Sequence, residues 1–221
     1  MAQKSKNVMQ AGQKRRIAST VLLVVLVLVA MLARLLIPYR YVSDRAPADA
    51  WYRAIQVGMP EEEWLPILRE SPDGEILYLA DSSFNYAYAD GCYLALFTFG
   101  NYRVRSVTAC SQKGELLYCY GVRPIAFDSA DPPRTLTEAR RRYGEFHGER
   151  GTGAWCPLYV TDRGTLIEFH VYRDNDTVTV IRELPLDKKD LDAPGDTTCI
   201  IYENEAWRDW WEQGYDTADG R

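Results

Sequence analysis

An uncharged apolar run near the N-terminus constrains this chain more than any other feature. Residues 17–33 carry no charged side chain, and apolar residues resume after Arg34. Extended past that single arginine, the run reaches the roughly 20 residues that a helix needs to cross a hydrocarbon core of about 30 Å. Only a helix satisfies its backbone hydrogen bonds within so short a segment. The run therefore predicts a membrane-spanning helix over residues 17–38.

The charges on either side of the run predict its orientation. Five cations and no acidic residue lie in residues 1–16, whereas the arginines that follow the run stand near Asp44 and Asp49. Positive charge is retained on the cytoplasmic side, so we expect a cytoplasmic N-terminus, a single pass through the plasma membrane and an extracytoplasmic C-terminal domain. A cleaved secretory signal is the alternative. Met31 argues against it, because a small residue is needed three positions before a cut after Ala33.

The part of the chain after the run is strongly acidic. All 31 acidic residues and 19 of the 26 basic ones lie in residues 41–221, which gives this part a net charge of −12 against −5 for the whole chain. Nucleic acids and anionic lipid surfaces bind cationic proteins. The charge therefore excludes nucleic acid as an expected partner.

The five cysteines all lie in this acidic part, where oxidation is permitted if it is outside the cytoplasm. Their number is odd, so at least one stays outside any intrachain disulfide, and no spacing matches a zinc site. Cys110 and Cys119 flank the turn at Gly114 and are expected on neighbouring strands, with Cys92 on the next. One disulfide within this trio is predicted, with Cys110–Cys119 as the candidate pair. Buried thiols are the alternative. The cysteines are Cys92, Cys110, Cys119, Cys156 and Cys199.

Helical patterns are short and strand patterns dominate. Two short helices are expected between Asp49 and Pro72, divided at Gly58, and a third over 135–144, capped by Thr135 or Thr137 and stopped by Gly144. Hairpin-linked strands then predict an antiparallel sheet. The expected strands cover 76–79, 92–99, 102–110, 116–120, 157–161, 165–172 and 177–184.

The order of helix, strand and hairpin occurs twice. Glu63 and Glu138, both in expected helices, are 75 residues apart, and Gly91 and Gly164, both opening hairpins, are 73 apart. A nearly constant offset indicates duplication. We therefore predict an α+β fold in which the transmembrane helix is followed by two tandem repeats of short helices packed on an antiparallel β-sheet. The expected segments are a tail over 1–16, the helix over 17–38, a linker over 39–50, a first repeat over 51–126, and a second over 127–221 with a C-terminal strand and a Trp-rich helix.

The entry to the first repeat resembles a known family. The segment Ile55–Leu68 reads IQVGMPEEEWLPIL and is followed by Pro72. It is similar to the motif I-x-x-G-M-T-x-x-E-V-x-x-L-L-G-x-P of the β-lactamase-inhibitor-protein-like and BamE (SmpA/OmlA) family, with Pro60 in place of Thr and Arg69 in place of Gly. The second copy keeps Glu138 and Gly144. The resemblance covers about residues 50–184 and implies a protein-binding module, since members of this fold class generally bind proteins.

Aromatic residues are the candidate partner contacts. Phe84, Tyr86 and Tyr88 alternate in an expected loop, and exposed aromatics concentrate binding energy. The alternative is that they anchor this loop onto the domain's own core. A second aromatic stripe, on an expected helix over 205–213, is expected to pack on the sheet; it consists of Trp207, Trp210 and Trp211.

The chemistry-bearing residues specify no reaction by themselves. Cys156 and His170 can form a nucleophile and base, but no third member is evident, and ordinary strand residues are the preferred interpretation. The glycines of 148–153 lack the helix that a phosphate site requires. Asp174 and Asp176 fit a turn as well as a calcium site. We therefore expect no catalytic residues, no metal and no cofactor.

Together these features predict a membrane-anchored extracytoplasmic protein-binding module that acts in envelope assembly or on an envelope enzyme. Its expected partners are the membrane, through residues 17–38, and another extracytoplasmic protein. An extracytoplasmic hydrolase that uses a cysteine or carboxylates is one alternative. An accessory subunit of a membrane complex is the other.

Overall fold

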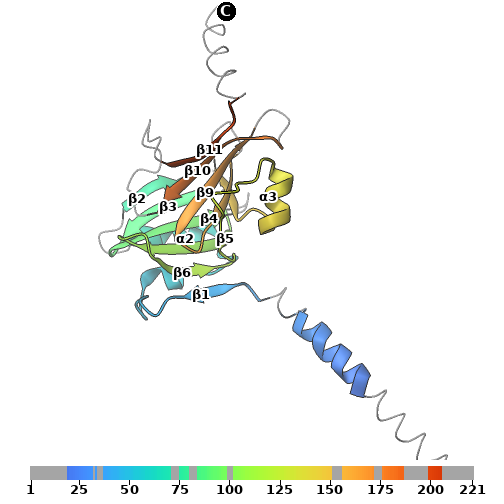
Figure 1. Ribbon diagram of the computed structural model, residues 1–221. Helices are drawn as coiled ribbons and strands as arrows, with labels where there is room; N and C mark the ends of the chain where they lie inside the picture. Colours follow the sequence, from blue (N-terminus) through green and yellow to red (C-terminus); the bar gives the residue numbers. More distant parts are fainter. Residues whose placement is uncertain are drawn as a thin grey trace, which may run out of the picture. The chain divides into compact units, whose positions relative to one another are not determined.

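The computed structural model in Figure 1 describes residues 19–31, 33, 37–70, 75–79, 84–98, 102–150, 156–171, 176–186 and 199–205. The chain divides into two units, Met1–Pro38 and Tyr39–Arg221. The predicted Trp-rich helix over 205–213 falls almost entirely outside the described residues, as do its three tryptophans.

The prediction of a membrane-spanning helix is contradicted. Within the described residues, no helix combines the length and the apolar character that crossing a bilayer requires. In the N-terminal unit, helical residues are described over 19–31 and at 33. The anchor predicted over 17–38 and the single-pass plasma-membrane localisation that rested on it are therefore corrected.

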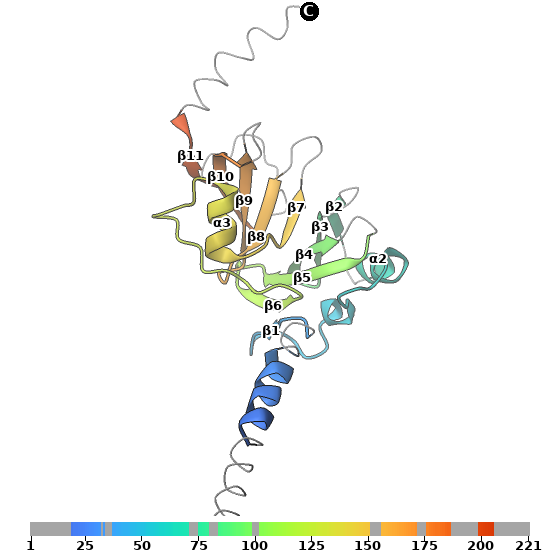
Figure 2. The same cartoon turned by 90° about the vertical axis from the view of Figure 1, so that its right-hand side faces the viewer.

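The second unit is built on two antiparallel sheets. The first has six strands in the order β1-β6-β5-β4-β3-β2, and the second has five in the order β11-β10-β9-β8-β7. The strands of the two sheets run in clearly different directions (Figure 2). The first sheet contains β1 (Arg40–Val42), β2 (Glu75–Leu79), β3 (Phe84–Ala89), β4 (Cys92–Thr98), β5 (Val104–Ser111) and β6 (Leu116–Tyr120). The second contains β7 (Gly148–Arg150), β8 (Cys156–Val160), β9 (Thr165–Val171), β10 (Val178–Pro185) and β11 (Ile200–Glu203).

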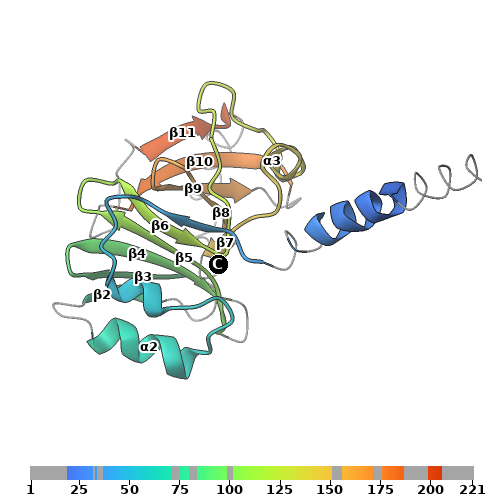
Figure 3. The same ribbon diagram turned by 90° about the horizontal axis from the view of Figure 1, so that it is seen from below.

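Three short helical segments cover the outer faces of the sheets. The 3-10 helix η1 (Trp51–Ala54) and α2 (Glu61–Glu70) lie on the six-stranded sheet, and α3 (Leu136–Tyr143) lies on the five-stranded one (Figure 3). Three apolar clusters separate these layers. The one between the two sheets joins Phe84, Tyr86 and Phe97 of the first sheet to residues of the second, which are Leu158, Val160, Leu166 and Leu184.

This architecture corrects the predicted fold class. The chain is mainly antiparallel β-structure with few helices, and its sheets stack face to face, rather than each helix pair defining a repeat. The physical reason lies in burial. β4 is buried at every position, which means that both of its faces are covered. A strand of a single helix-covered sheet would alternate between buried and exposed side chains.

The segment predicted as an aromatic loop is the strand β3. Phe84, Tyr86 and Tyr88 alternate with small residues, and this period of two is the strand pattern. β3 pairs with β4 through Ala89 opposite Cys92 and Phe84 opposite Phe97. The turn between them is at Gly91, which has a φ of 71°. Gly91 therefore precedes the strand predicted over 92–99, as expected, but it joins that strand to a segment that was predicted as a loop.

The predicted N-cap of α3 is confirmed. Thr135 Oγ1 accepts a hydrogen bond from the Glu138 amide at 3.0 Å, and the helix ends at Gly144, which has a φ of 85°. A threonine cap satisfies one of the amides that the first helical turn leaves without a partner.

Replacing the cap should measure its contribution. We expect Thr135→Ala to lower the free energy of unfolding by about 1 kcal/mol, because the Glu138 amide loses its acceptor. Thr135→Ser keeps the hydroxyl and is the matched control. Chemical denaturation of both variants checks this, and equal stabilities of the two variants would contradict a role for the hydroxyl.

Candidate functional site

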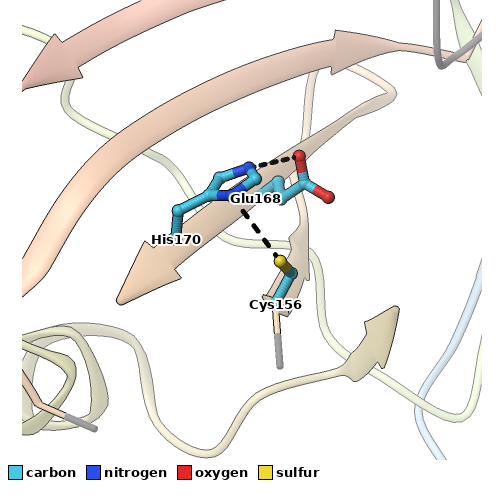
Figure 4. A group of neighbouring side chains, drawn as sticks. All are labelled: Cys156, Glu168 and His170. Carbon is cyan, nitrogen blue, oxygen red and sulfur yellow. Dashed lines mark hydrogen bonds and ion pairs between the residues drawn. The ribbon is translucent and has the colours of Figure 1, made fainter. Parts of the chain in front are cut away.

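A thiol, an imidazole and a carboxylate converge on one face of the five-stranded sheet. β8 and β9 pair antiparallel with Leu158 opposite Glu168. Two residues further along this register, Cys156 lies opposite His170. Side chains two positions apart on a strand point to the same face, so Glu168 and His170 both face Cys156. Figure 4 shows the three side chains directed toward one another.

The contacts form a chain with the imidazole in the middle. Cys156 Sγ lies 3.7 Å from His170 Nδ1, and His170 Nε2 lies 2.9 Å from Glu168 Oε2. The thiol and the carboxylate therefore use opposite nitrogens of the ring. The Glu168 side chain is 1% exposed and that of His170 is 35% exposed, whereas Cys156 is buried. The imidazole is thus the member that reaches solvent.

A fourth residue neutralises the buried carboxylate. Arg182 Nη1 lies 3.6 Å from Glu168 Oε2, on β10 directly opposite Glu168 in the register. A buried charge is costly unless it is paired. Arg182 and His170 together supply that pairing, so Glu168 can remain ionised as a hydrogen-bond acceptor for Nε2–H.

The neighbours of His170 also set its protonation. Burial by itself lowers the pKa of the imidazole, but the hydrogen bonds to Cys156 and Glu168 and the negative charge of Glu168 raise it, and the resulting pKa is about 9. The ring is therefore mainly protonated at neutral pH. The protonated ring lies 3.7 Å from the Cys156 sulfur.

The inward face of the five-stranded sheet is apolar except at one end, where Cys156, Glu168, His170 and Arg182 lie. Leu158, Leu166 and Leu184 lie on this same face and belong to the cluster between the sheets. Their neighbours two positions along the strands are Cys156, Glu168 and Arg182. Polar side chains at inward-facing positions of a sheet are unusual unless they are paired or functional. The cluster is therefore a candidate site.

Cys156, Glu168 and His170 have the connectivity of nucleophile, base and orienting group. A base that contacts a nucleophile through one nitrogen, while a third group holds its other nitrogen, is the arrangement that activates serine and cysteine nucleophiles. Their ligand atoms also all lie within 4.8 Å of one another, close enough to hold a metal ion. Both kinds of chemistry depend on the thiolate of Cys156.

The sequence pointed to only half of this site. Cys156 and His170 were considered as a nucleophile and base, but Glu168 was not, and neither was Arg182. The sequence signal that could have found Glu168 is a charged residue at a core-facing position of a predicted strand, two residues before His170.

The structure places the candidate partner contacts in the interior. Phe84 and Tyr86 are buried between the sheets, and the Tyr86 hydroxyl donates to the carbonyl of Leu186. Tyr88 is half-buried and packs on Tyr93, with 4.8 Å between the ring centroids. This burial favours the alternative interpretation, in which the aromatics anchor onto the domain's own core.

The candidate disulfide pair is not a cross-strand pair. All five cysteines are thiols in the structure. Cys119 lies opposite Thr108, and Cys110 lies opposite Leu116 with its sulfur 3.4 Å from the carbonyl oxygen of Gly164. Burial raises the pKa of Cys119 to about 12, which makes that thiol unreactive. The Cys110–Cys119 disulfide stays a prediction that this register does not favour.

His147 and Asp176 have structural roles. His147 Nδ1 accepts a hydrogen bond from the amide of Val160 at 2.9 Å and lies in the core. Asp176 accepts from the amide and hydroxyl of Thr137, each at 2.9 Å, at the start of α3. Asp174 lies outside the described residues, as do residues 151–153 of the glycine-spaced segment.

Comparisons with known proteins add no identification. No family model matches the chain, and neither a curated protein nor a solved structure matches it. These comparisons do not bear on the resemblance to the β-lactamase-inhibitor-protein-like and BamE family, which stays a prediction.

Proposed function

We propose that the chain is a hydrolase that cleaves an activated acyl group, with Cys156 as nucleophile. The observation that carries this proposal is the continuous Cys156–His170–Glu168 contact chain. Each member has one role: the thiolate attacks, the imidazole transfers the proton, and the carboxylate orients the imidazole.

The reaction class follows from these roles. Cys156 Sγ attacks the carbonyl carbon of an ester, thioester or amide, and a carbon–sulfur bond forms as the bond to the leaving group breaks. His170 Nδ1 holds the thiol proton and gives it to the leaving group. Water then attacks the thioester while His170 removes its proton. The acid product leaves, and the thiol is restored.

Glu168 determines which ring nitrogen works as the base. Because its carboxylate accepts from Nε2–H at 2.9 Å, the proton that moves is the one on Nδ1, which faces the sulfur. Arg182 holds Glu168 in its ionised form from the other side. His170 is the member of the cluster with the most exposed side chain.

Hydrolysis of an activated thioester or aryl ester by the full chain tests the proposal. We expect Cys156→Ser and His170→Gln each to lower the rate by about 100-fold or more, because loss of a positioned base alone typically costs 10²–10⁴-fold. After incubation with a slowly hydrolysed substrate, intact-mass analysis of the protein should show one acyl group on wild type and none on Cys156→Ser.

Cys199→Ser is the matched control, since it removes a thiol outside the cluster and should leave the rate unchanged. Circular dichroism establishes that each variant is folded. Equal rates for wild type and Cys156→Ser would reject the hydrolase and leave the cluster as a structural network around a buried carboxylate.

The protein-binding module remains the competing proposal. Its predicted contact surface has lost support, because Phe84 and Tyr86 are buried. A pull-down with folded Cys156→Ser that still recovers a partner would separate binding from hydrolysis.

A further inference from the structure

The cluster also has the geometry of an inner-sphere metal site. In a tetrahedral zinc centre, Zn–S is about 2.3 Å and Zn–N about 2.0–2.1 Å, so bound sulfur and nitrogen atoms are about 3.6 Å apart. Cys156 Sγ and His170 Nδ1 are 3.7 Å apart. A zinc ion could join these two atoms without a change of strand register.

The position of Glu168 supports the same assignment. Histidines that bind zinc almost always donate their other ring N–H to a carboxylate or carbonyl, which fixes the tautomer. Glu168 Oε2 holds Nε2 in this way at 2.9 Å, so Nδ1, which lies beside the sulfur, is the ring nitrogen that can bind a metal once its proton is displaced. Arg182, 3.6 Å from the same oxygen, keeps that carboxylate charged.

We infer that Cys156 and His170 bind a thiophilic divalent cation of the zinc class, with Glu168 as the group that orients the histidine. Two protein ligands leave two positions of a tetrahedral ion for water or another ligand. Binding displaces the proton that Cys156 and His170 share, so affinity rises with pH. Because the same sulfur cannot bind metal and attack a carbonyl at once, zinc should inhibit the proposed hydrolase. That consequence rests on the proposed function, whereas metal binding does not.

Cobalt(II), a spectroscopic substitute for zinc, tests the inference directly. We expect titration of Co²⁺ into the reduced, chelator-treated full chain to produce a near-ultraviolet thiolate-to-cobalt band that saturates at one equivalent and disappears when Zn²⁺ is added. Cys156→Ser should abolish the band. Glu168→Gln, which keeps an acceptor for Nε2–H but removes the charge, should weaken affinity by about 10–100-fold. Cys199→Ser should bind like wild type.

A second measurement uses wild type alone. Zn²⁺ should protect Cys156, but not Cys199, from alkylation by iodoacetamide. Absence of the cobalt band in wild type, its retention in Cys156→Ser, or alkylation of Cys156 at an unchanged rate would each overturn the metal site. Cysteine-dependent metal binding without hydrolysis would reject only the enzyme, and hydrolysis unaffected by zinc would reject only the metal site.

Discussion

Replacement of Gly148 by alanine is expected to lower the free energy of unfolding by about 3 kcal/mol, the largest single-substitution effect we foresee. A Cβ at this position would lie 2.0 Å from Cδ1 of Phe97, where β7 packs against the other sheet. Phe97 is fully buried and its ring cannot turn aside, so the sheets must separate or the ring must leave its preferred conformation. Such overpacking typically costs 1–3 kcal/mol, and occasionally more.

A double-mutant cycle tests this cause. Phe97→Ala removes Cγ, Cδ1 and Cε1, the three ring atoms that the new methyl group would meet, so Gly148→Ala should cost less in the Phe97→Ala background than in wild type. Chemical denaturation of the four proteins gives the coupling. An equal cost in both backgrounds would show that the penalty comes from the backbone at Gly148 and not from contact between the sheets.

Acidification should destabilise the protein through His147. Burial is the main cause that lowers the pKa of this histidine, the charge of Arg105 adds to it, and the resulting pKa is about 3. In the unfolded chain His147 binds a proton near pH 6.5, whereas in the folded chain it stays neutral until the pH approaches 3. The contribution of neutral His147 to stability is therefore complete above pH 6.5 and is lost as the pH falls toward 3. Between pH 7 and pH 4 the loss amounts to about 3 kcal/mol, at 1.36 kcal/mol for each pH unit.

His147→Gln isolates this effect. The glutamine side-chain carbonyl can accept a hydrogen bond from the Val160 amide, as Nδ1 of His147 does in wild type. Glutamine, however, does not titrate. The stability difference between wild type and this variant should therefore shrink or reverse as the pH falls, whereas contributions from carboxylates cancel. His170 does not interfere, since its raised pKa contributes stability that is present below pH 6.5 and is lost only as the pH rises through about 9. A pH-independent difference would contradict a neutral, buried His147.

Local signals predicted local structure. The cap at Thr135 and the stop at Gly144 depend on hydrogen bonds within a single turn of helix, so nearby residues determine them. The hairpin turn at Gly164 needs a residue that tolerates a positive φ, which is 76° there, and glycine does so at little cost. The strands that these turns connect were predicted for the same reason.

Non-local pairing decided the rest. Neither periodicity nor composition indicates that the two sheets stack, because a strand covered on both faces loses the alternation that would reveal it, as β4 does. The membrane-spanning helix was predicted from the hydropathy of the N-terminal run, whereas no helix among the described residues is both long and apolar enough to cross a membrane.

The amino-acid sequence by itself determined individual strands, the hairpin turns, the α3 cap and the acidic charge of this protein, because each depends on neighbouring residues or on a sum over them. Only the tertiary structure decided that Phe84 and Tyr86 are core residues and that Cys156, His170 and Glu168 form one cluster. Strand register brings together side chains that lie 14 positions apart in the chain, such as Cys156 and His170, and a shift of one residue would turn them to opposite faces. The chemistry of the site therefore resides in the pairing of β8 with β9.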